Sequence, residues 1–223
     1  MKDKRKRFFR YVSVWLLLVV ASVIAGPSVV SEKLLGQVAS LYGNSARERL
    51  LDWLALMDSH DTASEMEKLT IVNDFFNNMR FVDDIDHWGK EDYWATPVEF
   101  LASRGGDCED YSIAKYYTLK KMGVSIERMR ITYVKALELN QAHMVLTYYQ
   151  SPESVPLVLD NINSNILPAI ERNDLVPVYS FNADGLWLAK SRTMGHKVGK
   201  ASRVSLWDDL VMRIDTEMIN KAK

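Results

Sequence analysis

Gly105-Gly106-Asp107-Cys108-Glu109-Asp110-Tyr111 is the stretch around which the rest of the chain is organised. It holds the one cysteine of the 223 residues, and a helix-like run from Tyr111 to Met122 follows it. A glycine-rich turn that delivers a cysteine onto the first turn of a helix suits a nucleophile, because the unpaired N–H groups and the helix dipole favour a thiolate there. A buried structural cysteine is the alternative, since free cysteines are often buried.

Length and composition fit one substantial core. The chain has 28 basic and 29 acidic residues and is 48% hydrophobic, which is enough for one domain with a helical extension. The charge balance is not basic enough to suggest nucleic-acid binding, and the composition is not polar enough to suggest disorder.

The N-terminus differs from the rest of the chain. Six basic residues between Lys2 and Arg10 precede a run from Tyr11 to Ala25 that is almost wholly apolar. An apolar run of about fifteen residues falls short of the roughly 20 of a membrane span and fits a secretory signal. We therefore expect residues 1–25 to be a signal peptide or, alternatively, an uncleaved membrane anchor. Either way the body of the protein is expected to be exported, with the basic end on the cytoplasmic side.

Export changes how a lone cysteine is interpreted. Secreted chains normally use cysteines in disulfide-bonded pairs, and a single one cannot close an intramolecular disulfide. A thiol exposed to oxidants is easier to explain if chemistry requires it. An intermolecular disulfide is the alternative.

Helical periodicity dominates the first half of the chain, and a stretch rich in acids and aromatics, 81–93, is predicted to be a loop. The expected helices begin at Ser31, at a cap formed by Asn44 or Ser45, at Ser64 and at Thr96. Ser64–Glu67 and Thr96–Glu99 are capping-box patterns, and the helix from Thr96 runs to Ser103 and stops at Gly105-Gly106.

From Arg128 the hydrophobic period changes to two, which is typical of strands. Strands are expected over 129–135, 142–149, 155–162, 176–181 and 186–189, with a hairpin turn at 182–185, a basic loop at 190–203 and a closing helix at 206–219. Helices followed by a block of strands predict an α+β fold with an antiparallel sheet.

A cysteine nucleophile needs a base, and the base needs a third group to orient it. His143 begins a strand that looks buried, where a polar ring needs a partner. Asp160 ends an apolar run. If their strands are neighbours and the helix of Cys108 packs across them, the three side chains form a triad. A satisfied core histidine and a turn carboxylate are the alternatives.

From about Asn73 to Trp187 the sequence resembles the bacterial transglutaminase-like cysteine proteinases. The resemblance rests on Trp88-Gly89, Asp92-Tyr93-Trp94-Ala95-Thr96-Pro97, Gly106 to Tyr111, Thr132 to Ala136, Ala142 to Leu146, and Pro156 to Asn161. It implies that Cys108 is the nucleophile, His143 the general base and acid, and Asp160 the orienting residue. The implied fold is a papain-like transglutaminase core, a cysteine-bearing helix packed on an antiparallel sheet, over 96–223. An N-terminal helical lobe and acidic loop would occupy 26–95.

The resemblance also implies a substrate and a regulator. Such an enzyme hydrolyses one peptide bond near the N-terminus of a large surface adhesin, next to two alanines, and so releases cells from a biofilm. An inner-membrane receptor that senses cyclic di-GMP holds it inactive. Two other functions stay open: the same triad could transfer the acyl group to an amine, as a transglutaminase does, or the protein could be a non-catalytic calcium-binding regulatory module.

The acids beside Cys108 present an electrostatic problem, because negative charge raises the pKa of a thiol above its usual value of about 8.5. A bound cation would reverse the local field. Clustered carboxylates suit calcium (Ca2+), and the resemblance implies calcium dependence; carboxylates that only cap the helix are the alternative. The expected ligands are Asp107 and Glu109, then Asp110, with Asp83, Asp84 and Asp86 as candidates to complete the shell.

The oxyanion formed by thiolate attack needs hydrogen-bond donors. The backbone N–H of Cys108 is the default donor, and Trp88 or Tyr93 is a candidate for a second. Trp88, Tyr93 and Trp94 are equally consistent with core packing or a cleft wall.

Overall fold

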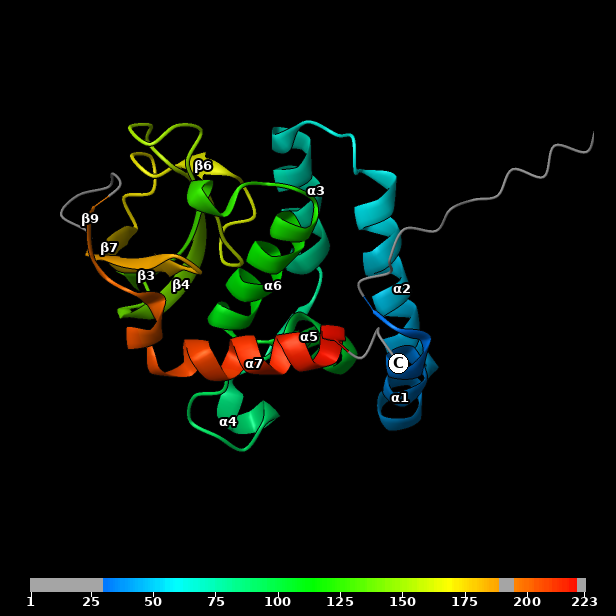
Figure 1. The fold of residues 1–223 in the computed structure, drawn as a ribbon. Helices are drawn as coiled ribbons and strands as arrows, with labels where there is room; N and C mark the ends of the chain where they lie inside the picture. The colour runs from blue at the N-terminus through cyan, green and yellow to red at the C-terminus, as the bar shows by residue number, and fades with distance from the viewer. Residues whose placement is uncertain (1–29, 189–194, 220–223) are drawn as a thin grey trace, which may run out of the picture.

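The computed structural model describes residues 30–188 and 195–219 (Figure 1). The predicted signal peptide or anchor lies outside these residues. Within the described part, no helix is long and apolar enough to cross a membrane.

Three helices open the described chain: α1 (Glu32–Tyr42), α2 (Asn44–Ser59) and α3 (Glu65–Asn77). Ser31 caps α1 as expected, accepting a hydrogen bond from the Leu34 N–H at 3.2 Å. The cap predicted for α2 is wrong. Gly43 takes that position with a positive φ of 87°, which glycine adopts without strain, and it ends α1 as well.

The stretch predicted as a loop, 81–93, contains one turn of helix, α4 (Asp84–His87). In this turn the N–H of Trp88 donates to the Asp84 carbonyl at 2.7 Å. A single turn is too short to give a periodic signal in the sequence. Helix α5 (Pro97–Ser103) has the complete capping box that Thr96 and Glu99 predict.

Helix α5 ends at Ser103 as predicted, and its C-cap, Arg104, takes a left-handed conformation just before the two glycines. The glycines themselves form β2 (Gly105–Gly106), which pairs in parallel with β1 (Arg80–Phe81). A Cβ atom at residue 105 would lie 2.3 Å from the Arg80 carbonyl oxygen. The glycine is therefore needed for the close approach of two backbones.

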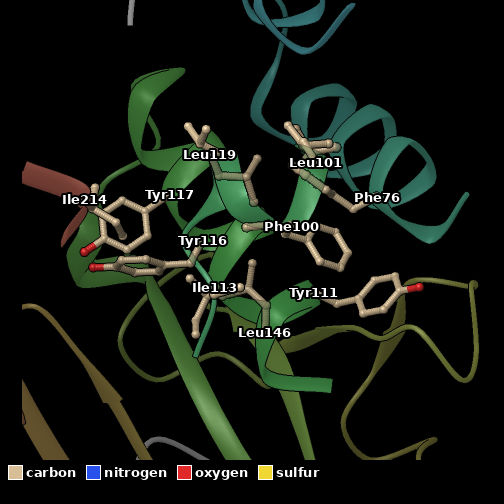
Figure 2. Close-up of a cluster of buried hydrophobic side chains, with 14 of the residues drawn as sticks. Phe76, Phe100, Leu101, Tyr111, Ile113, Tyr116, Tyr117, Leu119, Leu146 and Ile214 are labelled. Carbon is tan, nitrogen blue, oxygen red and sulfur yellow. The ribbon is translucent and has the colours of Figure 1, made fainter. Parts of the chain in front are cut away.

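Helix α6 (Cys108–Lys121) is the central element of the fold. It contacts β3 and β4 on one side and α3 on the other (Figure 1). Every residue from Glu109 to Leu119 is buried, as expected for a helix surrounded by protein. Its apolar side chains join Phe76 of α3, Leu146 of β4 and Ile214 of the C-terminal helix in one core (Figure 2). The boundary predicted at 95/96 stays a prediction.

A seven-stranded antiparallel sheet follows, which confirms the predicted α+β class. A short 3-10 helix, Ile126–Arg128, precedes it, and its spatial order is β6-β5-β4-β3-β7-β8-β9. The strands are β3 (Met129–Ala136), β4 (Gln141–Tyr148), β5 (Leu157–Leu159), β6 (Leu167–Pro168), β7 (Leu175–Asn182), β8 (Gly185–Leu188) and β9 (His196–Gly199). The predicted hairpin turn is confirmed, since Asn182 pairs with Gly185.

Two differences from the expected strands have physical reasons. β5 is shorter than 155–162 because the chain turns at Asp160, whose side chain accepts a hydrogen bond from the Ile162 N–H at 3.0 Å. The prediction of a loop over 190–203 is wrong for two parts of that segment. β9 pairs with β8, and a 3-10 helix, Ala201–Arg203, follows it. Helix α7 (Ser205–Ile219) then crosses in front of α6 and α5 (Figure 1).

Candidate active site

A cleft of about 530 Å³ lies where the N-terminus of α6 meets the sheet. Its walls include Asp107, Cys108 and Glu109 at the start of α6, Gln141 to Met144 of β4, the stacked rings of Tyr133 and Tyr179, and Val204 to Leu206 at the start of α7. The segment 81–94 contributes Phe81, Asp83, Glu91, Asp92 and Trp94. Antiparallel pairing places β5 next to β4, with Leu146 opposite Leu159. Residue 160 therefore follows directly on a strand adjacent to that of residue 143.

Cys108 is the first residue of α6 and is half-buried. Its thiol donates to a carboxylate oxygen of Glu109 at 3.1 Å, and its sulfur accepts a hydrogen bond from the Met144 N–H on β4. Burial raises the pKa of the thiol well above its usual value, and the charges of Glu109 and Asp107 raise it further. The protein alone therefore holds the thiol protonated, as the flanking acids lead us to expect.

His143 and Asp160 are hydrogen-bonded to each other. The distance from His143 Nε2 to Asp160 Oδ1 is 2.8 Å, and both residues are almost fully buried. With Nε2 directed at Asp160, Nδ1 lies on the other side of the imidazole ring. Cys108 and His143 both line the cleft, and Asp160 contacts His143 through this hydrogen bond.

Asp160 is surrounded by hydrogen-bond donors. The buried guanidinium of Arg172 donates to Asp160 Oδ2 at 2.6 Å and also pairs with Asp174. Burial alone would raise the pKa of Asp160, but the hydrogen bond and charge of His143, together with donors from Ile162 and Arg172, lower it to about 2. Arg172 could not be predicted from the sequence, because it lies in an irregular polar segment in which no periodic pattern singles out a residue.

A second network holds the backbone at Asp160. Asn77 at the end of α3 donates to the Asp160 carbonyl at 2.8 Å and accepts from Lys115 of α6 at 2.7 Å. Lys115 also donates to Asn73 at 2.9 Å. Burial lowers the pKa of Lys115 to about 7. Three helical residues therefore stabilise the turn that carries the carboxylate.

The predicted acids lie together, and they share two further partners. Ligand atoms of Asp84, Asp107 and Asp110 lie within 4.8 Å of one another, and so do those of Asp84, Asp92 and Glu109. Asp84 belongs to both groups, whereas Asp92 was missed as a ligand. Of the other candidates, Asp83 lines the cleft, and Asp86 is exposed and belongs to neither group among the described residues. We call Asp84, Asp92, Asp107, Glu109 and Asp110 the acidic cluster.

The acidic cluster lacks positive partners among the described residues. Burial raises the pKa of Asp84 to about 6 and, with Glu109 and Asp110 adding repulsion, that of Asp107 to about 10. One buried oxygen each of Asp84, Asp107 and Asp110 has no hydrogen-bond partner within the described chain. A Cβ atom at Gly106 would lie 2.0 Å from Asp110 Oδ2, so only glycine leaves room for that carboxylate. Converging buried oxygens of this kind fit a hard divalent cation.

The aromatic candidates separate into core and wall. Trp88 and Tyr93 pack against the main core, and among the described residues neither lines the cleft. The Tyr93 N–H donates to Asp84 and its hydroxyl to Glu99, so the expected second oxyanion donor finds no support there. Trp94 stacks on Phe181 and does line the cleft.

The chain is similar to known proteins in both sequence and structure. The chain matches the family described as bacterial transglutaminase-like cysteine proteinase over residues 53–181. An EGTA-treated LapG from Legionella pneumophila is 45% identical, with a TM-score of 0.73, covering 85% of this chain and 100% of that one. A calcium-bound LapG from the same organism is 44% identical, with a TM-score of 0.71, covering 83% and 99%. No curated protein matches.

Proposed function

The chain belongs to the bacterial transglutaminase-like cysteine proteinases, and we propose that it is a calcium-dependent endopeptidase that uses Cys108, His143 and Asp160. The observation that carries the proposal is the 2.8 Å hydrogen bond between His143 and Asp160 beside the cleft that Cys108 lines. This arrangement is what a nucleophile, a base and an orienting group require.

In the first half of the reaction, the Cys108 thiol gives its proton to Nδ1 of His143. The sulfur attacks the carbonyl carbon of the scissile peptide bond, and the C–S bond forms as negative charge moves to the carbonyl oxygen. The backbone N–H of Cys108 is the expected donor for that charge. The C–N bond then breaks, and His143 delivers its proton to the departing amine.

In the second half, water gives a proton to His143 and attacks the thioester. The C–S bond breaks, the new carboxyl group leaves, and the sulfur regains its proton. Asp160 holds the imidazole in the tautomer that keeps hydrogen on Nε2. Its pKa of about 2 keeps it ionised at every working pH, so that it stabilises the imidazolium in both halves.

The calcium part of the proposal is supported by the acidic cluster and by the relatives. Calcium-bound and EGTA-treated forms of LapG are known. In this chain, buried carboxylate oxygens lie close to one another beside Cys108. A bound ion supplies positive charge that offsets the field raising the thiol pKa. Asp84, Asp92, Asp107, Glu109 and Asp110 are the residues that would hold it.

We further propose the biological setting that family membership suggests. The substrate is the N-terminal region of a large surface adhesin, cut next to a pair of alanines, and its release disperses a biofilm. The enzyme works in the periplasm after export through the N-terminal segment 1–25, and an inner-membrane cyclic di-GMP receptor inhibits it.

The test is incubation of the purified protein with the N-terminal part of a candidate adhesin, with calcium and with EGTA, beside a Cys108→Ala control. We expect one cut that needs both calcium and Cys108, with unchanged circular dichroism in the variant. Cleavage by Cys108→Ala, or full cleavage in excess EGTA, contradicts the proposal.

The same assay separates the competing functions. A primary amine added to the reaction would become conjugated to the adhesin fragment if acyl transfer were the main activity. Hydrolysis instead yields two free fragments whatever the amine concentration. Calcium binding without any product would indicate a regulatory module.

A further inference from the structure

Helix α7 is joined to the chain segment 93–99, beside the acidic cluster, by two side chains. Glu217 accepts a hydrogen bond from the Thr96 hydroxyl at 2.9 Å, and Arg213 makes the larger number of contacts. Arg213, in the second half of α7, donates to Glu99 at 2.7 Å, to the Tyr93 hydroxyl at 3.1 Å and to the Trp94 carbonyl. Its guanidinium also lies over the Tyr93 ring, 4.7 Å from the centroid. One half-buried arginine therefore holds the segment 93–99 through several charge-assisted contacts.

The backbone of the same segment also orients carboxylates of the acidic cluster. The Tyr93 N–H donates to Asp84 Oδ2, and the Ala95 N–H donates to Asp110 Oδ1 at 2.7 Å. Asp92, at the start of the segment, is itself a member of the acidic cluster. Three of the five acids thus depend for their placement on backbone that Arg213 fixes.

We propose that Arg213 is a positioning residue for the calcium site, and this inference rests on the proposed function. Hydrogen-bonded partners behind metal ligands hold the ligand geometry, and their loss typically weakens metal binding by about 10- to 100-fold. Arg213 acts in this way although it is not a ligand, through the backbone of Tyr93 and Ala95. The C-terminal helix thereby becomes part of the metal site.

The protein contains a matched control for this idea. Arg128 forms an ion pair with Glu65 at 2.6 Å and donates to the Tyr148 hydroxyl, which donates to the same glutamate. It also donates to the Tyr149 carbonyl at 3.0 Å and lies 4.9 Å from the Tyr148 ring centroid. The chemistry and exposure are those of the Arg213 cluster, with side chains 30% and 24% exposed. Among the described residues, this cluster shares no member with the cleft or the acids.

The experiment compares full-length wild type, Arg213→Met and Arg128→Met by isothermal titration with calcium and by melting of the metal-free proteins. We expect the calcium Kd of Arg213→Met to rise by about tenfold or more. That of Arg128→Met should stay within about twofold, because the sites are separate. Both variants should lose thermal stability when metal-free. An unchanged Kd in Arg213→Met, or an equal rise in both variants, overturns the inference.

A milder pair keeps the test decisive if Arg213→Met does not fold. Tyr93→Phe removes one hydroxyl from the Arg213 cluster, and Tyr148→Phe removes its counterpart. We expect about a threefold rise in Kd for Tyr93→Phe alone, and equal Kd values in the pair overturn the inference. If wild type itself binds no calcium, the calcium part of the proposed function fails together with this inference. If wild type binds calcium and the variants bind it equally well, only the inference is overturned.

Discussion

Two carboxylate environments border the chemistry at Cys108, and they are opposite in kind. Asp160 has donors on both oxygens, from His143 and Ile162 on one and Arg172 on the other, and its pKa is lowered to about 2. Asp107 is half-buried among other carboxylates, and its pKa is raised to about 10. The residue type is the same, so the difference comes from the neighbours.

The comparison shows which end of the site the protein completes by itself. The Asp160 end needs nothing further, because every charge there has a partner within the chain. The acidic cluster holds carboxylates against one another and needs a positive charge from outside. Substitutions at the two ends should therefore respond differently to calcium.

The largest effect is expected for Asp160→Asn. An amide keeps the shape of the side chain but favours the wrong histidine tautomer and carries no charge, so kcat should fall by about 1,000-fold. Added calcium should restore none of it. The measurement is kcat for the adhesin fragment at saturating calcium. Asp174→Asn is the control, since Asp174 pairs with Arg172 without contacting His143. An equal loss of kcat in this control would mean that the loss comes from disturbing Arg172 and not from the contact with His143.

Asp107→Asn should give the opposite pattern. Loss of one ligand charge weakens calcium binding by about 10- to 100-fold, and activity should recover as calcium is raised. The metal-free variant should melt at a higher temperature than wild type, because a carboxyl with a raised pKa costs stability at neutral pH. Titration calorimetry and melting curves measure both effects. A metal-free variant less stable than wild type would remove the contrast between the two ends.

The contrast also explains what the sequence could predict. Helix α6 and the strand of His143 follow from local periodicity, and the turn at Asp160 follows from its Asp-Asn pair. Their meeting requires only that β4 and β5 be neighbours, which a short connection favours. The predicted cysteine and histidine therefore line one cleft, and the predicted aspartate is hydrogen-bonded to that histidine.

The residues that the sequence left unplaced are those positioned by tertiary contacts alone. The sequence predicts a loop at Asp92. Its approach to Glu109 depends on the short helix α4 and on the hydrogen bonds that the Tyr93 and Ala95 N–H groups donate to Asp84 and Asp110. Arg172 reaches Asp160 from an irregular segment. No repeat or cap marks such positions, so spacing could not identify them.

The pH dependence of stability should show the acidic cluster directly. Asp84 and Asp107 have folded-state pKa values of about 6 and about 10, above the unfolded value of 3.8. The folded metal-free protein then holds protons that the unfolded chain has lost, so its stability falls as pH rises from about 4. Calcium binding should offset the fall. The difference in melting temperature between calcium-loaded and metal-free protein should grow from pH 5 to 8, and a shrinking difference would contradict the proposed cluster.

The smallest effect concerns the buried cation behind Asp160. Lys115 has a pKa lowered by burial to about 7, below the 10.5 of the unfolded chain. Between these values the unfolded state binds more protons, so this group makes the protein more stable as pH rises through that window. Lys115→Met removes the contribution, and wild type should gain in melting temperature over the variant as pH rises from 7 to 9.5. Calcium is kept saturating so that the acidic cluster cancels. If the melting temperatures of wild type and variant change in parallel with pH, Asn73 and Asn77 hold the Lys115 ammonium charged throughout. Lys115 would then be as fully paired as the charges around Asp160.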